Sequence, residues 1–306
     1  MPDESTNTRA AEQASGEPPA EIGGAEQADT KSSSNGAAAE GGSHQMNLAR
    51  PTAEDIYQQV AQNAKTELKR STISLAISGF AGGIFMGLSG LGSALVLGFF
   101  GTSPTTHFVA SMFYPIGFIV VIIGRAQLFT ENTLYPVALV LSEKRELWNT
   151  LRLWCTVLPA NVCGALAFAA LASRTSALPP ETKQALVRLG LQAAHMTPAT
   201  IFWSGVTAGW IIATAAWLVS GSHSITGSVM ILWILTFVVG LGNFAHCIAT
   251  SGEILSSVLV RQLSAMSYFH WLWIAVAGNV CGGVFMVTVL EYGQAILAKG
   301  EPPLEN

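Results

Sequence analysis

The chain has 306 residues, of which 50% are hydrophobic and only 11% are charged, and its mean hydropathy is +0.43. Soluble domains carry about 25% charged residues, so this composition excludes an ordinary soluble protein and predicts an integral membrane protein. The formal net charge of −4 comes mainly from the first 50 residues. No cofactor, metal site or nucleic-acid partner is expected.

Residues 1–50 are rich in Glu, Ser, Gly and Ala and contain no apolar run. Such a stretch buries too little apolar surface to fold alone, and it lacks the basic start and apolar core of a signal peptide. We expect a disordered acidic N-terminal tail over 1–50 and a cytoplasmic pre-membrane helix over 51–70. A membrane domain over 71–295 and a C-terminal tail over 296–306 follow.

Six apolar blocks follow the tail, and a membrane-spanning helix needs about 20 apolar residues. The second and fifth blocks are longer than that, and polar residues interrupt them at GRAQLFTENT (124–133) and GNFAHCIATSGE (242–253). Non-helical backbone at membrane depth is tolerated only where protein or a water-filled cavity surrounds it. These features predict an all-α polytopic membrane protein with six transmembrane segments and broken second and fifth helices. The blocks are 72–101, 105–141, 148–173, 198–221, 225–262 and 270–295.

The two halves of the chain align when the sequence is shifted by 118 residues. The run Asn161-Val162-Cys163-Gly164 falls on Asn279-Val280-Cys281-Gly282, Gly87 falls on Gly205, and Gly124 falls on Gly242. Three spans per half is an odd number, so the halves are expected to be inverted repeats. Paired broken helices in such repeats predict a transport site near the midplane of the membrane, where the halves meet.

Basic residues near the ends of the spans set the predicted orientation. The basic residues close to the span ends lie mainly on the side that holds both termini, and such residues are enriched on the cytoplasmic side of a membrane. We therefore expect both termini in the cytoplasm. The loop over 174–197 then lies on the opposite side and is expected to contain a short helix that starts at Pro180. The residues on the cytoplasmic side are Lys65, Lys69, Arg70, Lys144, Arg145, Arg152 and Lys299, and those on the other side are Arg174, Lys183, Arg188 and Arg261.

His246 is the sharpest candidate for function. An ionisable side chain within a membrane span is a functional candidate by default, and an imidazole exchanges protons near neutral pH. The alternative is a neutral histidine that bonds to a neighbouring carbonyl in the helix break. Thr130 lies in the other break, where its hydroxyl could face the imidazole across a pore and hold a small anion or a water. As an alternative or in addition, Thr130 caps a half-helix over 131–141.

Other polar and aromatic residues have simpler interpretations. Arg125, Glu131 and Glu253 are expected near a membrane face or in structural pairs, and pore lining is the alternative. The glycines of GFAGGIFMGLSGLG (79–92) indicate close helix packing. Trp271 and Trp273 are interpreted as an interfacial aromatic anchor.

With these residues placed, the chain resembles the formate/nitrite transporter family over roughly 65–295. The residues that carry the resemblance are GRAQLFTENT, the histidine of FAHCIAT, and the motifs ANVCG and GNVCGG. Within the family it is similar to the YfdC-like branch of bacterial inner membrane proteins. The resemblance implies an aquaporin-like fold in the inner membrane and a homopentamer with one pore per protomer. It also implies passage of small monovalent anions of weak acids, with or without a proton.

The resemblance also implies pore residues. The matched positions are Leu128, Phe129 and Thr130 in the first break, His246 and Thr250 in the second, Tyr114 and Val239 at an outer apolar constriction, and Phe118, Leu128 and Ile212 at an inner one. The chain departs from the family's pattern at Ala245, where an acidic residue often stands, at Thr250, where an asparagine does, and at Gly209. The lysine that draws anions into the outer vestibule falls near Ala193, and His195 is the nearby basic candidate.

The predicted function is a transmembrane transporter or channel for small monovalent anions, pH-dependent or proton-coupled through His246, and not an enzyme. One alternative is a neutral small-solute channel of aquaporin-like fold, although the Asn-Pro-Ala pair of aquaporins is absent. Another is an intramembrane serine hydrolase that uses Ser89 of Gly87-Leu88-Ser89-Gly90 with His246 as its base.

Overall fold

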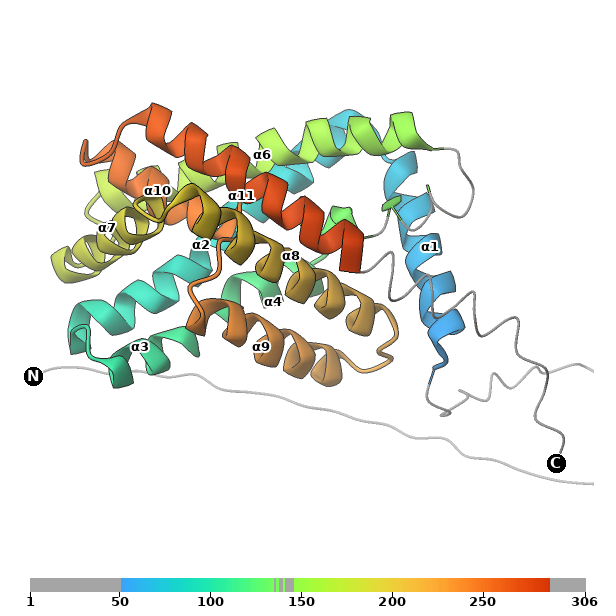
Figure 1. The fold of residues 1–306 in the computed structure, drawn as a ribbon, viewed down its shortest axis with the longest axis horizontal. Coiled ribbons are helices and arrows are strands. Elements are labelled where there is room, and N and C mark those ends of the chain that lie inside the picture. Colours follow the sequence, from blue (N-terminus) through green and yellow to red (C-terminus); the bar gives the residue numbers. More distant parts are fainter. Residues whose placement is uncertain (1–50, 135, 138–139, 141–145, 287–306) are drawn as a thin grey trace, which may run out of the picture. The chain divides into compact units, whose positions relative to one another are not determined.

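The computed structural model describes residues 51–134, 136, 137, 140 and 146–286, and every regular element among them is a helix. The tails predicted over 1–50 and 296–306 lie outside these residues. Figure 1 shows the helices α1 (Ala53–Lys69), α2 (Thr72–Phe100), α3 (Pro104–Ser111), α4 (Pro115–Ile123), η1 (Glu131–Thr133), α6 (Leu147–Arg174), α7 (Pro180–Ala194), α8 (Pro198–Ser220), α9 (Ile225–Leu241), α10 (Ala249–Leu259) and α11 (Ala265–Met286).

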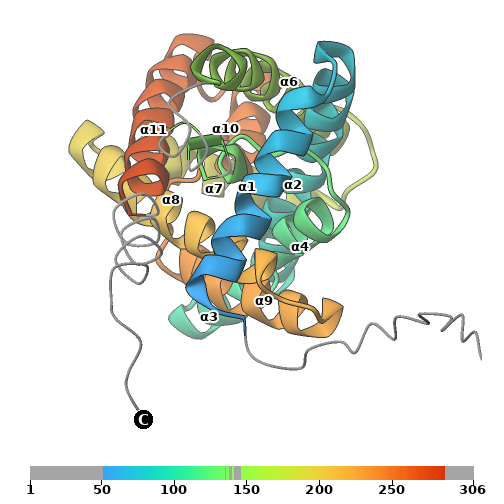
Figure 2. The same ribbon diagram turned by 90° about the vertical axis from the view of Figure 1, so that its right-hand side faces the viewer.

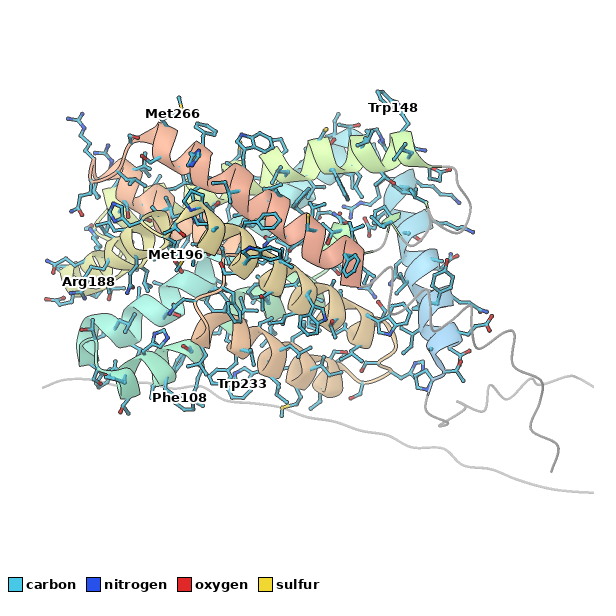
Figure 3. All side chains as sticks on the ribbon, in the orientation of Figure 1. Phe108, Trp148, Arg188, Met196, Trp233 and Met266 are labelled. Atoms are coloured by element: carbon cyan, nitrogen blue, oxygen red, sulfur yellow. The ribbon has the colours of Figure 1, made fainter. Side chains whose placement is uncertain are left out.

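Five helical segments of the described chain are long and apolar enough to cross a membrane: Thr72–Phe100, Pro104–Ile123, Leu147–Arg174, Pro198–Ser220 and Ala265–Phe285. The fifth predicted block contributes the shorter apolar helix α9 instead, because that helix ends at Leu241. Figure 3 shows large side chains such as Phe108, Trp148 and Met266 pointing away from the bundle, and all three are exposed. An exposed apolar surface of this kind suits contact with lipid or with other subunits.

Both predicted interruptions are present and begin with the same backbone geometry. The helix ends at a glycine, and the next residue is left-handed: Arg125 (φ 58°) in the first break and Asn243 (φ 51°) in the second. The following N–H then bonds to the carbonyl five residues earlier, at 3.0 Å and 3.1 Å respectively. This pattern is a Schellman motif, which closes a helix end. The second break is shorter than predicted, because α10 already starts at Ala249.

An asparagine of α6 holds the first break in place. The side-chain oxygen of Asn161 accepts a hydrogen bond from the backbone N–H of Phe129 at 2.9 Å. Its amide nitrogen donates to the carbonyls of Gln127 at 2.8 Å and Gly79 at 2.6 Å. Asn161 is fully buried, so these bonds satisfy backbone groups that have no access to water.

Asn279 of α11 makes the corresponding contacts in the second break. Its side-chain oxygen accepts from the N–H of Cys247 at 2.8 Å, and its amide nitrogen donates to the carbonyls of Ala245 and Gly205, both at 2.8 Å. Asn279 is also fully buried. The break residues and the asparagines therefore correspond at the predicted shift of 118 residues.

The predicted match of Gly87 with Gly205 is wrong. The carbonyl that Asn161 binds on α2 belongs to Gly79, so Gly79 is the counterpart of Gly205 and the shift in this helix is 126 residues. Gly87 instead packs against Phe168 of α6. The first half carries eight more residues between this glycine and its break, which a gap-free alignment cannot accommodate. The glycines of α2 do allow close packing, because a Cβ on Gly83 would overlap the backbone of Asn161.

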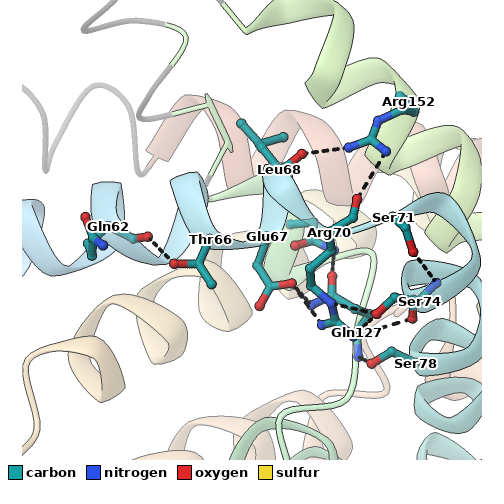
Figure 4. Close-up of polar contacts among 11 residues, drawn as sticks. Gln62, Thr66, Glu67, Leu68, Arg70, Ser71, Ser74, Ser78, Gln127 and Arg152 are labelled. Carbon is teal, nitrogen blue, oxygen red and sulfur yellow. Dashed lines mark hydrogen bonds and ion pairs between the residues drawn. The ribbon is translucent and has the colours of Figure 1, made fainter.

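Helix α1, which forms within the predicted pre-membrane segment, lies across one end of the bundle (Figure 2). The side-chain amide of Gln127 in the first break donates to the carboxylate of Glu67 at 2.7 Å, and Glu67 pairs with Arg70 at 3.0 Å (Figure 4). Arg152 of α6 donates to the carbonyl of Leu68 at 2.7 Å. Hydrogen bonds thus join α1 to the first break and to α6.

Helix α7 confirms the short helix predicted to start at Pro180. It lies at the end of the bundle opposite α1 (Figure 1) and packs against α2 and α10. One end of the bundle is therefore covered by α1 and the other by α7, with both breaks between them.

Candidate functional site

The two breaks meet through one hydrogen bond between side chains. Nε2 of His246 lies 2.8 Å from Oγ1 of Thr130, and neither side chain is exposed at all. The pairing that the sequence suggested therefore exists, although it is direct rather than across an open gap. Thr130 makes no side-chain cap for the following η1 helix, so the predicted capping role is wrong. Its hydroxyl is committed to the imidazole instead.

The other ring nitrogen of His246 is an acceptor. Nδ1 receives the backbone N–H of Ala249 at 3.0 Å and that of Ile248 at 3.4 Å. An acceptor at Nδ1 assigns the neutral tautomer with its proton on Nε2, so Nε2–H donates to Thr130. The alternative of a histidine bonded to a neighbouring carbonyl is wrong, because its backbone partners are the free N–H groups at the start of α10.

Aromatic and aliphatic side chains surround the pair. The ring of Phe118 packs edge-on against the imidazole at 5.0 Å between centroids, and Tyr114 lies 5.6 Å from Phe118. Ile212 and Val239 are fully buried in the same cluster, and the side chain of Leu128 is 1% exposed. Phe118 thus contacts the imidazole directly, and Tyr114, Leu128, Ile212 and Val239 belong to the same buried apolar cluster.

Phe129 takes a different position from its neighbours. Its ring packs against Trp154 of α6 at 5.8 Å, and its backbone N–H is held by Asn161. The side chain is buried, and Phe129 is not among the residues that line the cavities described below. Phe129 therefore anchors the first break to α6 through its ring and its backbone N–H.

A small cavity of about 100 Å³ lies beside the apolar cluster, and we refer to it as the Glu253 cavity. Three of the predicted pore residues, Tyr114, Val239 and Thr250, line it together with Glu253 and Trp271. His246 and Thr130 do not line it. A solute in this cavity is thus separated from the imidazole by the rings of Tyr114 and Phe118.

A wider hollow of about 870 Å³ adjoins this cavity beside α7, and we refer to it as the α7 vestibule. His195 and Arg188 line it, and His107 and Met196 line both hollows. Figure 3 shows Arg188 and Met196 on this side of the molecule. Ala193, at the expected lysine position, faces the smaller cavity. Basic groups thus lie only in the wider part or at the junction, among the described lining residues.

Sequence reasoning missed two residues at this junction. His107 of α3 lies with Nε2 3.2 Å from the carbonyl oxygen of Leu241 and 3.4 Å from the side-chain nitrogen of Asn243. Asn243 could have been found from its place 118 residues after Arg125, directly after the glycine that ends the helix. Nothing in the sequence around His107 indicated that α3 would fold back toward the second break.

Glu253 and Trp271 differ from their predicted roles. Glu253 is 7% exposed, and no described residue hydrogen-bonds or forms an ion pair with its carboxyl group. It thus forms no structural pair with a described residue, and it lines the cavity, as the alternative of pore lining expected. Trp271 is 1% exposed, so it is not an interfacial anchor, whereas Trp273 is 63% exposed and fits that role.

The remaining candidates form no hydrogen bond with His246 or with the hydroxyl of Thr130. Arg125 is exposed at the start of the first break, and Glu131 is partly buried in η1. Ser89 is buried, but its hydroxyl has no hydrogen-bond partner among the described residues. Since both ring nitrogens of His246 bond elsewhere, the Ser89–His246 pair that a serine hydrolase needs is not formed.

Comparison with known proteins places this geometry in a family. The formate/nitrite transporter family model matches residues 54–293. The chain is 31% identical over 244 residues to the inner membrane protein YfdC of Escherichia coli (strain K12), covering 78% of this chain and 77% of that protein. It is 26% identical over 196 residues to a probable formate transporter of Methanothermobacter thermautotrophicus, covering 58% of this chain and 72% of that protein.

Solved structures show the same fold. A channel described as an FNT family ion channel superposes with a TM-score of 0.71 at 20% identity, covering 78% of this chain and 98% of that one. A pentameric formate channel with formate bound gives a TM-score of 0.56 at 20% identity, covering 75% and 94% respectively. The match of the family model to most of the chain shows that this protein belongs to the formate/nitrite transporter family.

Proposed function

We propose that this protein is a multi-pass inner-membrane transporter or channel for small monovalent anions of weak acids, such as formate or nitrite. The observation that carries the proposal is the buried hydrogen bond between Thr130 and His246, which joins the two breaks inside an apolar cluster. Transport by this chain is proposed to depend on pH through His246.

We further propose six spans arranged as two inverted three-helix repeats, with both termini in the cytoplasm. The identical starts of the two breaks and the matching contacts of Asn161 and Asn279 support the repeat. A pentamer is proposed because one of the similar structures is described as pentameric and because large apolar side chains are exposed on this chain.

The apolar cluster makes the charge of the solute the central problem. An unpaired anion in a dry, apolar passage is very costly, and protonation to the neutral acid removes most of that cost. At the waist, Thr130 accepts one hydrogen bond from His246 and keeps its own hydroxyl proton to donate to a solute. The pair therefore supplies a polar resting point inside the buried apolar cluster that contains Phe118 and Leu128.

Proton donation by His246 would require a local change. An imidazolium carries N–H on both nitrogens, and Nδ1 now faces two backbone N–H groups at the start of α10. Protonation must therefore release the first turn of α10 from the ring. In the arrangement described here, the imidazole is a neutral hydrogen-bond donor to Thr130, and its protonation at low pH is the proposed source of the pH dependence of transport.

Flux in proteoliposomes tests the role of His246. His246→Phe removes both hydrogen bonds and is expected to abolish pH-dependent flux of formate and nitrite. His246→Gln offers a neutral donor toward Thr130, so some flux should remain while its pH dependence is lost. Unchanged flux in His246→Phe would refute the proposal.

A neutral-solute channel is the second candidate, and one observation favours it. Among the described residues that line the Glu253 cavity, Glu253 is acidic. Ala193 stands at the position where the family's lysine was expected. A cavity of this kind does not retain a bare anion. Osmotic swelling of proteoliposomes with glycerol or urea separates the candidates, because rapid swelling without anion flux indicates a neutral-solute channel.

A further inference from the structure

Glu253 is a buried carboxyl group that forms no hydrogen bond or ion pair with any residue that the structure describes. It is 7% exposed, and its side chain faces the Glu253 cavity from α10. The neighbouring glycine of α2, Gly90, leaves room for this side chain, since a Cβ there would lie 3.0 Å from Cγ of Glu253. Buried carboxyl groups are ordinarily paired or hydrogen-bonded, so a missing protein partner indicates a partner that comes from the cavity.

A hydrogen-bond donor in the same cavity also lacks a partner. Nε1 of Trp271 is buried and bonds to no described residue, although Trp271 lines the cavity. Tyr114 and Thr250 line the same cavity as Glu253. The cavity therefore offers an indole N–H donor, two hydroxyl groups and a carboxyl group within about 100 Å³.

The other titratable groups around Glu253 are not placed to pair with it. His107 lines the cavity from α3 but bonds at the junction with Leu241 and Asn243, and Arg188 of α7 lies in the wider vestibule. Tyr268 of α11 bonds to Ser251. The faces that α2 and α6 turn toward α10 carry glycines and Phe168. Within the described part of the chain, no cationic side chain of the cavity lining therefore neutralises the carboxylate.

We propose that the Glu253 cavity is a second binding site, which holds a small weak acid and the Glu253 carboxyl group as a pair that shares one proton. The N–H of Trp271 donates to the free oxygen of the acid, and Tyr114 and Thr250 complete the site. This inference rests on the proposed transport of weak-acid anions and names the residue that supplies the proton.

The step balances in protons and charge. An anion that arrives from the α7 vestibule accepts the proton of the Glu253 carboxylic acid, which leaves a neutral acid and a carboxylate. The neutral acid moves on past Tyr114, and the carboxylate regains a proton from water in the vestibule. A charged solute thus becomes neutral before it reaches the apolar rings.

Binding of formate at a series of pH values tests the site. Full-length protein in lipid nanodiscs is titrated with carbon-13 formate by NMR line broadening between pH 5 and 8. The wild-type affinity is expected to fall as the pH rises, because a pair of ionised groups cannot share a proton. In Glu253→Gln the amide is neutral throughout, so the affinity should become independent of pH. Glu181→Gln, an exposed change on α7, should behave as wild type.

A second variant reports on the donor and does not alter the carboxyl group. Trp271→Phe is expected to weaken formate binding about tenfold at low pH, as expected for one lost hydrogen bond. Trp217→Phe, a buried tryptophan outside both hollows, serves as the matched control and should bind as wild type. This pair decides the question even if Glu253→Gln does not fold.

The outcomes separate the site from the proposed function. If Glu253→Gln keeps the wild-type pH profile, or Trp271→Phe binds as its control does, the site is refuted while transport can stand. If methylammonium binds in place of formate and requires Glu253, the cavity is a cation site and the inference is wrong. If the wild type moves neither formate nor nitrite but binds formate as described, the site stands and the proposed function fails.

Discussion

Nε2 of His246 and Oγ1 of Thr130 lie 2.8 Å apart, although 116 residues separate them in the chain. One residue comes from the break between α9 and α10, and the other comes from the break before η1. Since both side chains are fully buried, this bond ties the two halves together at a point without access to water. The integrity of the passage and its pH response therefore depend on the same contact.

Thr130→Val tests this contact with almost no change in volume. The valine cannot accept the Nε2–H of His246, so a buried donor loses its partner at a cost of about 1–3 kcal/mol. We expect formate flux to fall about tenfold or more, while Thr130→Ser retains most of it. Proteoliposome flux is the measurement, and equal flux in the valine and serine variants would contradict the assignment.

The asparagines should matter for folding more than for conduction. Asn279→Ala leaves the N–H of Cys247 and two carbonyls without partners in a buried region, and the expected loss is about 2–4 kcal/mol. Asn161→Ala should cost a similar amount, because it makes the same set of bonds. Thermal unfolding in detergent measures both. A small effect in one variant and a large one in the other would argue against equivalent roles.

Arg125 offers a stabilising substitution. A residue other than glycine in the left-handed region costs about 1 kcal/mol, and the exposed side chain of Arg125 forms no hydrogen bond or ion pair with a described residue. Arg125→Gly is therefore expected to raise the free energy of unfolding by about 0.5–1 kcal/mol. As a control, Arg174→Gly at the right-handed end of α6 should lower it. A lower melting temperature for Arg125→Gly would show that the arginine has an unrecognised role.

Helix α1 should loosen when its bond to the first break is lost. Glu67→Ala removes both the 2.7 Å bond from Gln127 and the pair with Arg70. We expect backbone amides of α1 to exchange with solvent about tenfold faster, since one charged hydrogen bond contributes at least about 1.5 kcal/mol. Gln59→Ala, whose partner Asn63 lies within α1, is the control. Similar exchange in the two variants would mean that α1 is held by its apolar face alone.

The start of α1 should fray in acid. The side-chain and backbone hydrogen bonds from Thr52 lower the pKa of Asp55 below its ordinary value of 3.8. A lowered pKa in the folded state stabilises the helix start above pH 3.8, and this contribution is lost as the pH falls through the folded-state pKa. Amide protection factors near Thr52 should therefore drop in that range. Asp55→Asn should show weaker protection without this pH dependence.

The sequence alone determined which segments are apolar enough to cross a membrane and that polar runs interrupt two of them. Half of the residues are hydrophobic, and the polar runs around Thr130 and His246 interrupt long apolar segments. Polar groups at such positions must be satisfied by protein or by a water-filled cavity, so these runs indicate breaks. The short helix at Pro180 and the correspondence of the two NVCG runs at a shift of 118 residues could also be predicted, whereas the bonds of their asparagines to the breaks could not. These features depend on composition and on patterns among residues that are close together in the chain.

Only the tertiary structure decided how these segments meet. The shift of 126 residues between Gly79 and Gly205 depends on which carbonyl each asparagine reaches across a helix contact. Glu253 and Trp271 face one cavity because α10 and α11 fold back beside α3 and α7, although each residue alone resembles a structural charge or a membrane anchor. Contacts between residues far apart in the chain follow from how helices cross and rotate, and hydropathy does not specify either.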